Sequence, residues 1–270
     1  MKKILLTLFT VLVITVNLTA QYSGNSGKLA TIREGVLTVG MEIGYFPMEY
    51  YDEDGRTPIG FDVSLAKALG EKMGLKVEIM DVAWDGIFAG LQTNRYDCII
   101  SAVTLTEERA LRFNFTKPYM INYQFLVVRK DSKVKPRSFD ETSGLRLAYP
   151  SDTIYNYFFA EWLDKTGIKV NDYSYYYYLS DCFDDLEQNR IDVILAESIE
   201  AANFISKPGN LFEISGKINI GEMFAICIKK EKYSLAHAID KALDELFGDG
   251  TMLKISNEVF GMDMVSEARN

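Results

Sequence analysis

The sequence predicts an α/β protein of two similar lobes, each a mixed sheet flanked by helices, joined by a two-strand hinge. Two observations support this fold class. Segments typical of strands and helices alternate along the chain in β–α–β order. In addition, FAGLQTNRYDCII (88–100) is echoed by FDDLEQNRIDVIL (183–195), with Phe, Leu, Asn, Arg and Asp in matching places. A repeated α/β unit of this kind indicates two lobes.

The first unit begins with VLTVGM (36–41), a short apolar run that predicts a strand. FDVSLAKALGEKMG (61–74) has apolar residues four apart and a closing glycine, which predicts a helix, and LKVEIMD (75–81) predicts the next strand. DGIFAGLQTN (85–94) predicts a second helix and YDCIISAV (96–103) a third strand. Strands joined by such helical crossovers are expected to be parallel.

The second unit repeats this order. LRLAYPSDTIYNYFFAEWLDKTG (145–167) predicts a strand, a turn and a helix, and YSYYYY (173–178) predicts a strand of alternating tyrosines. After the echo at 183–195, GEMFAICIKK (221–230) predicts one more strand. We expect it to return to the first lobe, so that the chain crosses between lobes near 120–125 and 219–224.

The expected lobes are therefore 30–121 with 223–270, and 122–222. Residues 1–20 predict a secretory signal peptide, because two lysines precede a thirteen-residue apolar run that ends before Ala20. Cleavage after Ala20 would place the mature protein in the periplasm; a retained N-terminal anchor is the alternative. No later segment has eighteen uninterrupted apolar residues.

The composition excludes several functions. The formal net charge is −9, and −11 without Lys2 and Lys3, which disfavours nucleic acid as a partner. The single histidine, His237, makes a histidine-based metal site or a Ser-His triad hard to build. We expect no metal and no cofactor. Three cysteines in apolar surroundings (Cys98, Cys182 and Cys227) predict buried free thiols rather than disulfides.

Arg109 is the first candidate binding residue. It is the last residue of SAVTLTEER (101–109), where Thr106 can cap a helix whose first turn carries Glu107 and Glu108. A cation at that place is disfavoured by the helix dipole, so we interpret Arg109 as waiting for an anion. The alternative is a surface arginine paired with Glu108 or a nearby aspartate.

The other candidates follow predicted strands, because ligands of open α/β sheets bind beyond the carboxyl ends of the strands. Together they offer a fixed cation, hydroxyls, carboxylates and aromatic surface, which is what a free amino acid requires. The aromatic candidates could instead be core residues, and the carboxylates could be solvated strand ends. The candidates are Glu42, Tyr45, Trp84, Ser101, Ala102, Thr104, Arg109, Thr153 and Glu197.

Six segments resemble the extracytoplasmic amino-acid-binding proteins of ABC importers, known as solute-binding protein family 3. The segments are YFPMEYYDEDG (45–55), GFDVSLAKALGEKMG (60–74), WDGIFAGLQTNRYDCIISAVTLTEER (84–109), FTKPY (115–119), FLVVRKDS (125–132) and DGTMLKISNEVFG (249–261). The resemblance implies a type II periplasmic-binding-protein fold, flytrap-like, that closes on one amino acid. It also implies delivery of that amino acid to membrane permease subunits by a monomer.

The resemblance further implies the role of each site residue. Arg109 would bind the α-carboxylate with Thr104 and the backbone around Ser101 and Ala102, and Thr153 would reach it from the second lobe. The other four would meet the rest of the ligand. Tyr45 and Trp84 would wall its side chain, Glu42 would meet its polar end, and Glu197 would take its ammonium group.

Two departures from the family pattern bear on the ligand. Glu197 stands where an aspartate is usual, and Asp152 precedes Thr153 where a glycine is usual. With Glu42, these carboxylates favour a polar or cationic amino acid. Two other functions remain open: a cyclohexadienyl dehydratase, in which Glu200 would be the acid, and a soluble ligand sensor with the same pocket.

Overall fold

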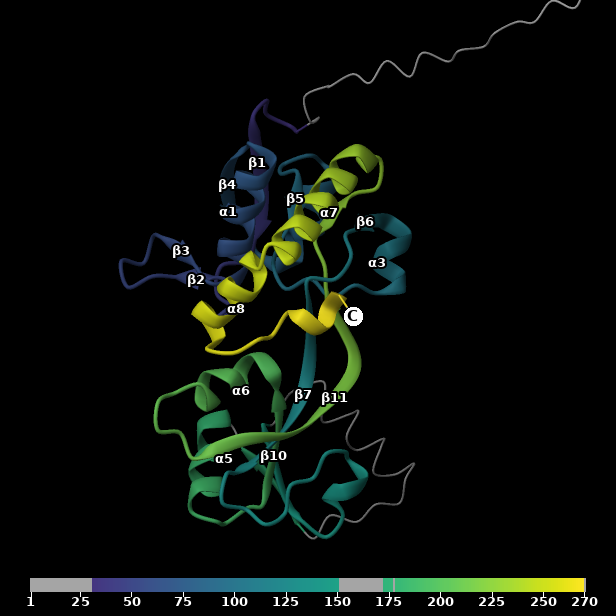
Figure 1. The fold of residues 1–270 in the computed structure, drawn as a ribbon. Coiled ribbons are helices and arrows are strands. Elements are labelled where there is room, and N and C mark those ends of the chain that lie inside the picture. The colour runs from purple at the N-terminus through teal and green to yellow at the C-terminus, as the bar shows by residue number, and fades with distance from the viewer. Residues whose placement is uncertain (1–30, 151–171, 177, 270) are drawn as a thin grey trace, which may run out of the picture.

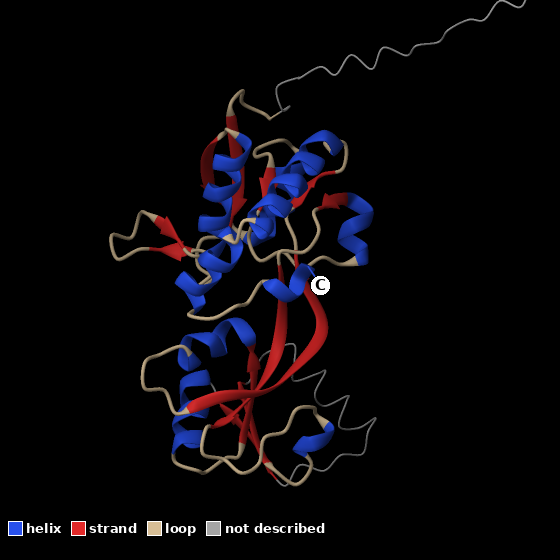
Figure 2. Cartoon of the chain, viewed as in Figure 1, coloured by secondary structure: helices blue, strands red, loops and turns tan. Residues whose placement is uncertain are grey.

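The computed structural model describes residues 31–150, 172–176 and 178–269, and within them the chain forms two five-stranded sheets and a small hairpin (Figures 1 and 2). In spatial order the first sheet contains β4 (Lys76–Asp81), β1 (Val36–Met41), β5 (Cys98–Ile99), β12 (Cys227–Lys229) and β6 (Phe113–Phe115). The second contains β9 (Asp172–Tyr176), β8 (Arg146–Pro150), β10 (Val193–Glu197), β7 (Met120–Arg129) and β11 (Phe212–Phe224). The hairpin pairs β2 (Tyr50–Tyr51) with β3 (Pro58–Ile59) and projects from the first lobe (Figure 2).

The two sheets share one topology. In the first, β4, β1 and β5 run parallel and β12 joins antiparallel to β5. In the second, β9, β8 and β10 run parallel and β7 joins antiparallel to β10. The parallel β–α–β units and the two-lobed architecture expected from the internal echo are thereby confirmed.

Helices cover the faces of the first sheet. α1 (Phe61–Met73) ends at Gly74, whose φ of 66° closes the helix as the sequence predicted. α7 (Tyr233–Gly248) and α8 (Thr251–Phe260) pack against α1, and α2 (Trp84–Gln92) packs against β1, β5 and β12. The buried faces of these elements form the core of the lobe.

The second sheet is flanked by α5 (Leu179–Glu187), which packs on β8 and β10, and by α6 (Ser198–Ile205), which packs on β7 and β10. Three short elements complete the described chain: α3 (Glu107–Arg112), the 3-10 turn η1 (Asp140–Thr142) and the 3-10 turn η2 (Ser266–Arg269). η2 contacts β7, so the C-terminal segment lies beside the connection between the sheets (Figure 1).

That connection consists of β7 and β11, which pair antiparallel and run from one sheet toward the other (Figure 1). At their upper end Met120 pairs with Phe224, and the N–H of Tyr119 donates to the carbonyl of Phe224 at 2.8 Å. β12 follows β11 directly and enters the first sheet. Two long adjacent strands thus form the predicted hinge, because bending them at this point moves the sheets relative to each other.

One predicted strand is shorter than expected. The sequence favoured a strand over 96–103, whereas β5 pairs only at Cys98 and Ile99. The chain turns away at Ala102, which has a φ of 43°, and the N–H of Ala102 donates to Asp62 instead of to a neighbouring strand.

Several further features of the described residues bear on the sequence analysis. The three cysteines are free and buried, as predicted. His237 lies exposed on α7. Within the described residues, no helix is long and apolar enough to cross a membrane, and no group of three His, Cys, Asp or Glu side chains is placed to hold a metal ion. The predicted signal peptide, 1–20, lies outside the described residues.

Candidate functional site

The carboxyl ends of β1 and β5 bring two candidates together. Because these strands are adjacent and parallel, Glu42 follows one and Ser101 follows the other at the same edge of the sheet. The N–H of Glu42 donates to Oγ of Ser101 at 3.0 Å. Oε1 of Glu42 accepts the N–H of Trp84 at 3.0 Å, which fixes the start of α2. Glu42 therefore has a structural contact in addition to any role toward a ligand.

Ser101 and Ala102 are already engaged within the protein. Oγ of Ser101 donates to Oε1 of Glu49 at 2.6 Å, and the N–H of Ala102 donates to Oδ2 of Asp62 at 2.7 Å. Glu49 and Asp62 were not foreseen from the sequence. Their position beneath the strand ends shows that this segment is held from below by two buried carboxyl groups.

Arg109 is half-buried beside two aromatic rings. Its guanidinium carbon lies 5.6 Å from the ring centroid of Trp84 and 5.0 Å from that of Phe88, and Nη1 donates to the carbonyl of Thr104 at 2.8 Å. Both ring distances are within the range of a cation–π contact. Among the described residues, no carboxylate lies within ion-pair distance of this guanidinium.

The argument from the helix dipole does not single out Arg109. Thr106 caps α3 as predicted, accepting the N–H of Arg109 at 3.2 Å. The helix has only six residues, however, so Arg109 is near both of its ends. Arg109 is distinguished instead by its surroundings, because its guanidinium packs on aromatic rings. Only one of its five N–H groups donates to Thr104.

Tyr45 links the first lobe to the second sheet. Its hydroxyl donates to Oε2 of Glu197, at the end of β10, over 3.4 Å. Burial raises the pKa of Tyr45 strongly, and the negative charges of Glu197 and Glu200 add to the effect. The phenol therefore remains a neutral donor near these carboxylates.

Asn122 and Glu222, on the hinge strands, extend this network. Nδ2 of Asn122 donates to Oε2 of Glu222 at 2.8 Å and to Oε2 of Glu197 at 3.3 Å. Oγ1 of Thr104 donates to Oε1 of Glu222 at 3.2 Å. A continuous polar chain therefore runs from Thr104 through both hinge strands to Glu197 and Tyr45.

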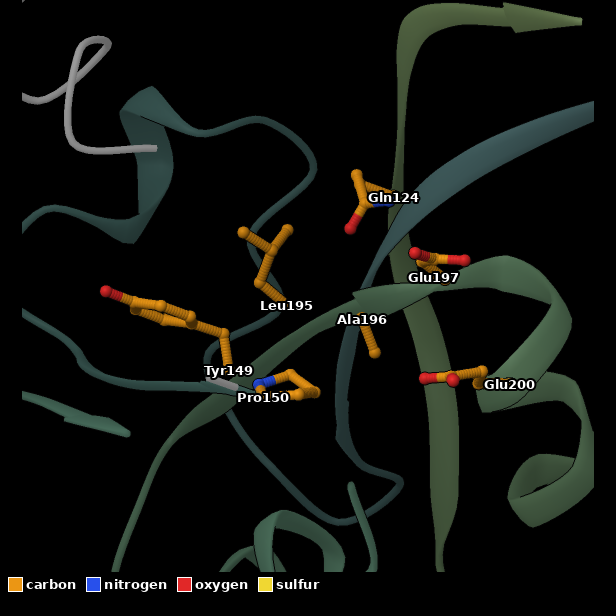
Figure 3. Close-up of a pocket in the computed structure, with 7 residues that line it drawn as sticks. All are labelled: Gln124, Tyr149, Pro150, Leu195, Ala196, Glu197 and Glu200. Carbon is orange, nitrogen blue, oxygen red and sulfur yellow. The ribbon is translucent and has the colours of Figure 1, made fainter. Parts of the chain in front are cut away.

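A small hollow opens at the carboxyl ends of β8 and β10 (Figure 3). Glu197 lies at the end of β10 and Glu200 in the first turn of α6, and their carboxylates line the hollow together with the amide of Gln124. Gln124 is 2% exposed, and its Nε2 has no hydrogen-bond partner. Desolvation raises the pKa of Glu200. The remaining lining residues are Tyr149, Pro150, Leu195 and Ala196.

The structure thus relates eight of the nine candidates to one another through contacts or adjacent strand ends. They are Glu42, Trp84, Ser101, Ala102, Thr104 and Arg109 on the first lobe, with Tyr45 joined to Glu197 of the second. Thr153 and the neighbouring Asp152 lie outside the described residues. The sequence carried a weak signal for Asn122 and Gln124, because both interrupt an otherwise apolar strand at alternate positions.

Comparison with known proteins places this geometry in a family. The family described as bacterial extracellular solute-binding proteins, family 3, matches residues 37–262. L-cystine-binding protein TcyJ of Escherichia coli (strain K12) is 28% identical over 245 residues, covering 89% of this chain and 88% of the relative. Arginine-binding extracellular protein ArtP of Bacillus subtilis (strain 168) is 29% identical over 262 residues, covering 96% and 98%.

A solved structure agrees with these relatives. It is a polar amino acid ABC uptake transporter substrate binding protein from Streptococcus thermophilus, with a TM-score of 0.78 and 28% identity, covering 87% of this chain and 89% of the other. These are binding proteins, so the dehydratase alternative finds no support. The chain belongs to the bacterial extracellular solute-binding proteins of family 3.

Proposed function

We propose that this protein captures a free polar or cationic amino acid between its two lobes and delivers it to the permease of an ABC importer. Membership of the family and the names of the relatives, which bind cystine, arginine or polar amino acids, support this function. The single observation that carries it is the guanidinium of Arg109, which rests on Trp84 and Phe88 and has no ion pair within the described residues.

The carboxylate of the amino acid would bind at Arg109. The carbonyl of Thr104 occupies one guanidinium N–H, which leaves a planar set of donors suited to a carboxylate. Ser101 and Ala102 would contribute the nearby backbone and Thr153 a hydroxyl from the second lobe. The hydroxyl of Thr104 would exchange Glu222 for the ligand as the cleft closes.

The ammonium group would bind at Glu197, taking the place of the weak contact from Tyr45. Tyr45 and Trp84 would flank the side chain of the amino acid. Glu42 would face the polar end of that side chain at the first lobe. On the other lobe, Glu200 and Gln124 add a carboxylate and an amide to the lining of the hollow, and these groups favour a cationic or amide-bearing ligand.

We further propose the division of the chain that this mechanism requires. Residues 30–121 and 223–270 form one lobe, 122–222 form the other, and β7 and β11 bend between them. The first twenty residues act as a signal peptide that is removed on export to the periplasm, where the protein works as a monomer.

A thermal-shift screen of the mature protein tests the function. The twenty amino acids and cystine are added singly, because a ligand that binds only the folded state raises the melting temperature. We expect one or a few hits, with polar or cationic side chains. Calorimetry with the best hit then compares Arg109→Ala with Arg112→Ala, an exposed arginine on the same short helix.

The expected difference is large because a charged hydrogen bond contributes about 1.5–3 kcal/mol, or roughly 10- to 150-fold in affinity. Arg109→Ala should therefore weaken binding at least tenfold, whereas Arg112→Ala should stay near the wild type. Full affinity in Arg109→Ala would exclude the proposed carboxylate site. A screen without hits would exclude free amino acids as the ligand.

A further inference from the structure

Two carboxyl groups are buried side by side under the end of β5. Glu49, from the turn before β2, is 1% exposed, and Asp62, from the first turn of α1, is 0% exposed. Neither belongs to the proposed ligand contacts. Both nevertheless hold the segment that carries Ser101 and Ala102, as described above.

Each carboxyl group has one oxygen with protein donors and one without. Oδ2 of Asp62 accepts the N–H of Ala102 at 2.7 Å and the hydroxyl of Tyr119 at 3.0 Å. Oε1 of Glu49 accepts the hydroxyl of Ser101 at 2.6 Å. The remaining oxygens, Oε2 of Glu49 and Oδ1 of Asp62, are buried and have no donor group.

Glu49 and Asp62 bind the neighbouring residues Ser101 and Ala102, so their carboxyl groups lie side by side. Two ionised carboxylates could not form a hydrogen bond to each other, because each is an acceptor only. Two adjacent buried negative charges would also be strongly destabilising. One proton between the two donorless oxygens satisfies both of them and removes one charge.

The surroundings supply no cation that would replace this proton. The titratable groups facing the pair are Glu42, Tyr45 and Tyr119, which are acidic. Within the described residues, no lysine or arginine forms an ion pair with either carboxyl group. Burial raises the pKa of Glu49 and that of Asp62, in agreement with a retained proton.

We propose that Glu49 is protonated at neutral pH and donates to Asp62, and that this pair positions the Ser101–Ala102 segment for ligand binding. The proton is assigned to Glu49 because Asp62 has two donors on its other oxygen, which stabilise its ionised form. The hydrogen of Oε2 points to Oδ1 of Asp62, and the pair carries one negative charge in total.

The consequence for the ligand rests on the proposed function. Asp62 holds the N–H of Ala102 in a left-handed conformation that is unusual for a residue other than glycine. Glu49 holds Ser101, which in turn holds the N–H of Glu42. Loss of the shared proton would add a second negative charge below the segment next to the ligand carboxylate, so binding should weaken at alkaline pH.

Infrared difference spectra test the proton without any ligand. The spectrum of the ligand-free wild type minus that of Glu49→Gln should contain, at neutral pH, a carbonyl band of a protonated carboxyl group that shifts in D₂O. Glutamine supports the same contacts, because its amide N–H can donate to Oδ1 of Asp62 and its oxygen can accept from Ser101. Absence of the band from the difference spectrum would overturn the proposal.

Stability against pH provides a second ligand-free measurement. A group that keeps its proton in the folded state but loses it on unfolding makes the unfolding equilibrium constant rise up to tenfold per pH unit. The retained proton stabilises the folded state. Its full contribution is present below the pKa of an unfolded glutamate, about 4.3, and it declines as pH rises. Glu49→Gln should show a shallower dependence; equal slopes in the two proteins would contradict the proposal.

The ligand affinities of two Glu49 variants then show whether the pair positions the Ser101–Ala102 segment or only stabilises the fold. With the best amino acid from the screen, Glu49→Ala should bind at least tenfold more weakly than wild type at neutral pH, and Glu49→Gln should restore binding to within threefold. Should Glu49→Gln fold poorly, the carboxyl ¹³C resonances of wild type report the same protonation. If these resonances show every buried glutamate ionised at neutral pH, the proposal fails even where the proposed ligand function holds.

Discussion

The hydroxyl of Tyr45 lies 3.4 Å from Oε2 of Glu197, and this contact joins the loop after β1 to the end of β10. At this distance the hydrogen bond is weak. A ligand ammonium group would be a stronger partner for the carboxylate, because both members of that pair are charged. The contact is therefore placed to hold the lobes near each other without competing strongly with a ligand.

Two substitutions of Tyr45 test the contributions of its hydroxyl group and its ring to binding separately. Tyr45→Phe should change the affinity for the amino acid by less than about threefold, since only a weak hydrogen bond is lost. Tyr45→Ala should weaken it more than about tenfold, because burial of an aromatic side chain contributes about 1.5–3 kcal/mol. Isothermal titration calorimetry measures both. Equal losses in the two variants would show that the hydroxyl, and not the ring, is what the ligand uses.

Replacing Glu197 by glutamine removes its charge and keeps an acceptor oxygen. Binding should weaken by roughly tenfold or more, because a charge-assisted hydrogen bond to the ammonium becomes a neutral one. Glu213→Gln is the matched control: Glu213 pairs with Lys135 on the surface of the second lobe. Calorimetry at one pH and salt concentration compares the variants, and a wild-type affinity in Glu197→Gln would remove this residue from the site.

Periodicity and strand order predicted much of the fold. The spacing of apolar residues placed α1 and β1, and the echo between 88–100 and 183–195 predicted the shared topology of the sheets. Glu42 and Ser101 could be paired from sequence because adjacent parallel strands end at one edge. The early end of β5 could not be predicted from the sequence, because it depends on the contact between Ala102 and Asp62, forty residues apart.

The side-chain contacts between the hinge strands could not be predicted from the sequence for a similar reason. Asn122 meets Glu222 across one hundred residues, and their register follows an irregularity in β11 between Asn219 and Glu222. A shift of one residue in register turns a side chain to the opposite face of a strand, so the alternation along 219–224 does not reveal which residues face inward. The carboxyl pair of Glu49 and Asp62 likewise depends on tertiary packing.

Glu267, in the C-terminal segment, should contribute a small acid-sensitive stabilisation. Its Oε1 lies 2.8 Å from Nζ of Lys217 on β11, and it also bonds Tyr123 on β7. Lys217 first, and then Tyr123, lowers the pKa of Glu267. A lowered carboxyl pKa stabilises the fold above the unfolded value of about 4.3 and loses this effect as pH falls through the folded value.

Glu267→Gln should therefore lower the free energy of unfolding by less than about 1 kcal/mol at neutral pH, since the ion pair is partly exposed. The difference from wild type should vanish at strongly acidic pH. Urea denaturation at a series of pH values measures it, with Glu258→Gln as a control in the exposed pair of α8 with Lys254. A difference that grows on acidification would reverse the assigned sign.

Gly90 and Gly86, one turn apart on α2, should respond oppositely to alanine. A Cβ on Gly90 would overlap Oη of the buried Tyr96, which is fixed by its hydrogen bond to the carbonyl of Ile87. Gly90→Ala should thus destabilise the protein by about 1–3 kcal/mol through overpacking. A Cβ on Gly86 meets nothing within 4 Å, so Gly86→Ala should stabilise it by about 0.5–1 kcal/mol through reduced backbone entropy in the unfolded chain. Urea denaturation distinguishes the two, and a shift of the same sign in both variants would contradict the packing of Tyr96 against this helix.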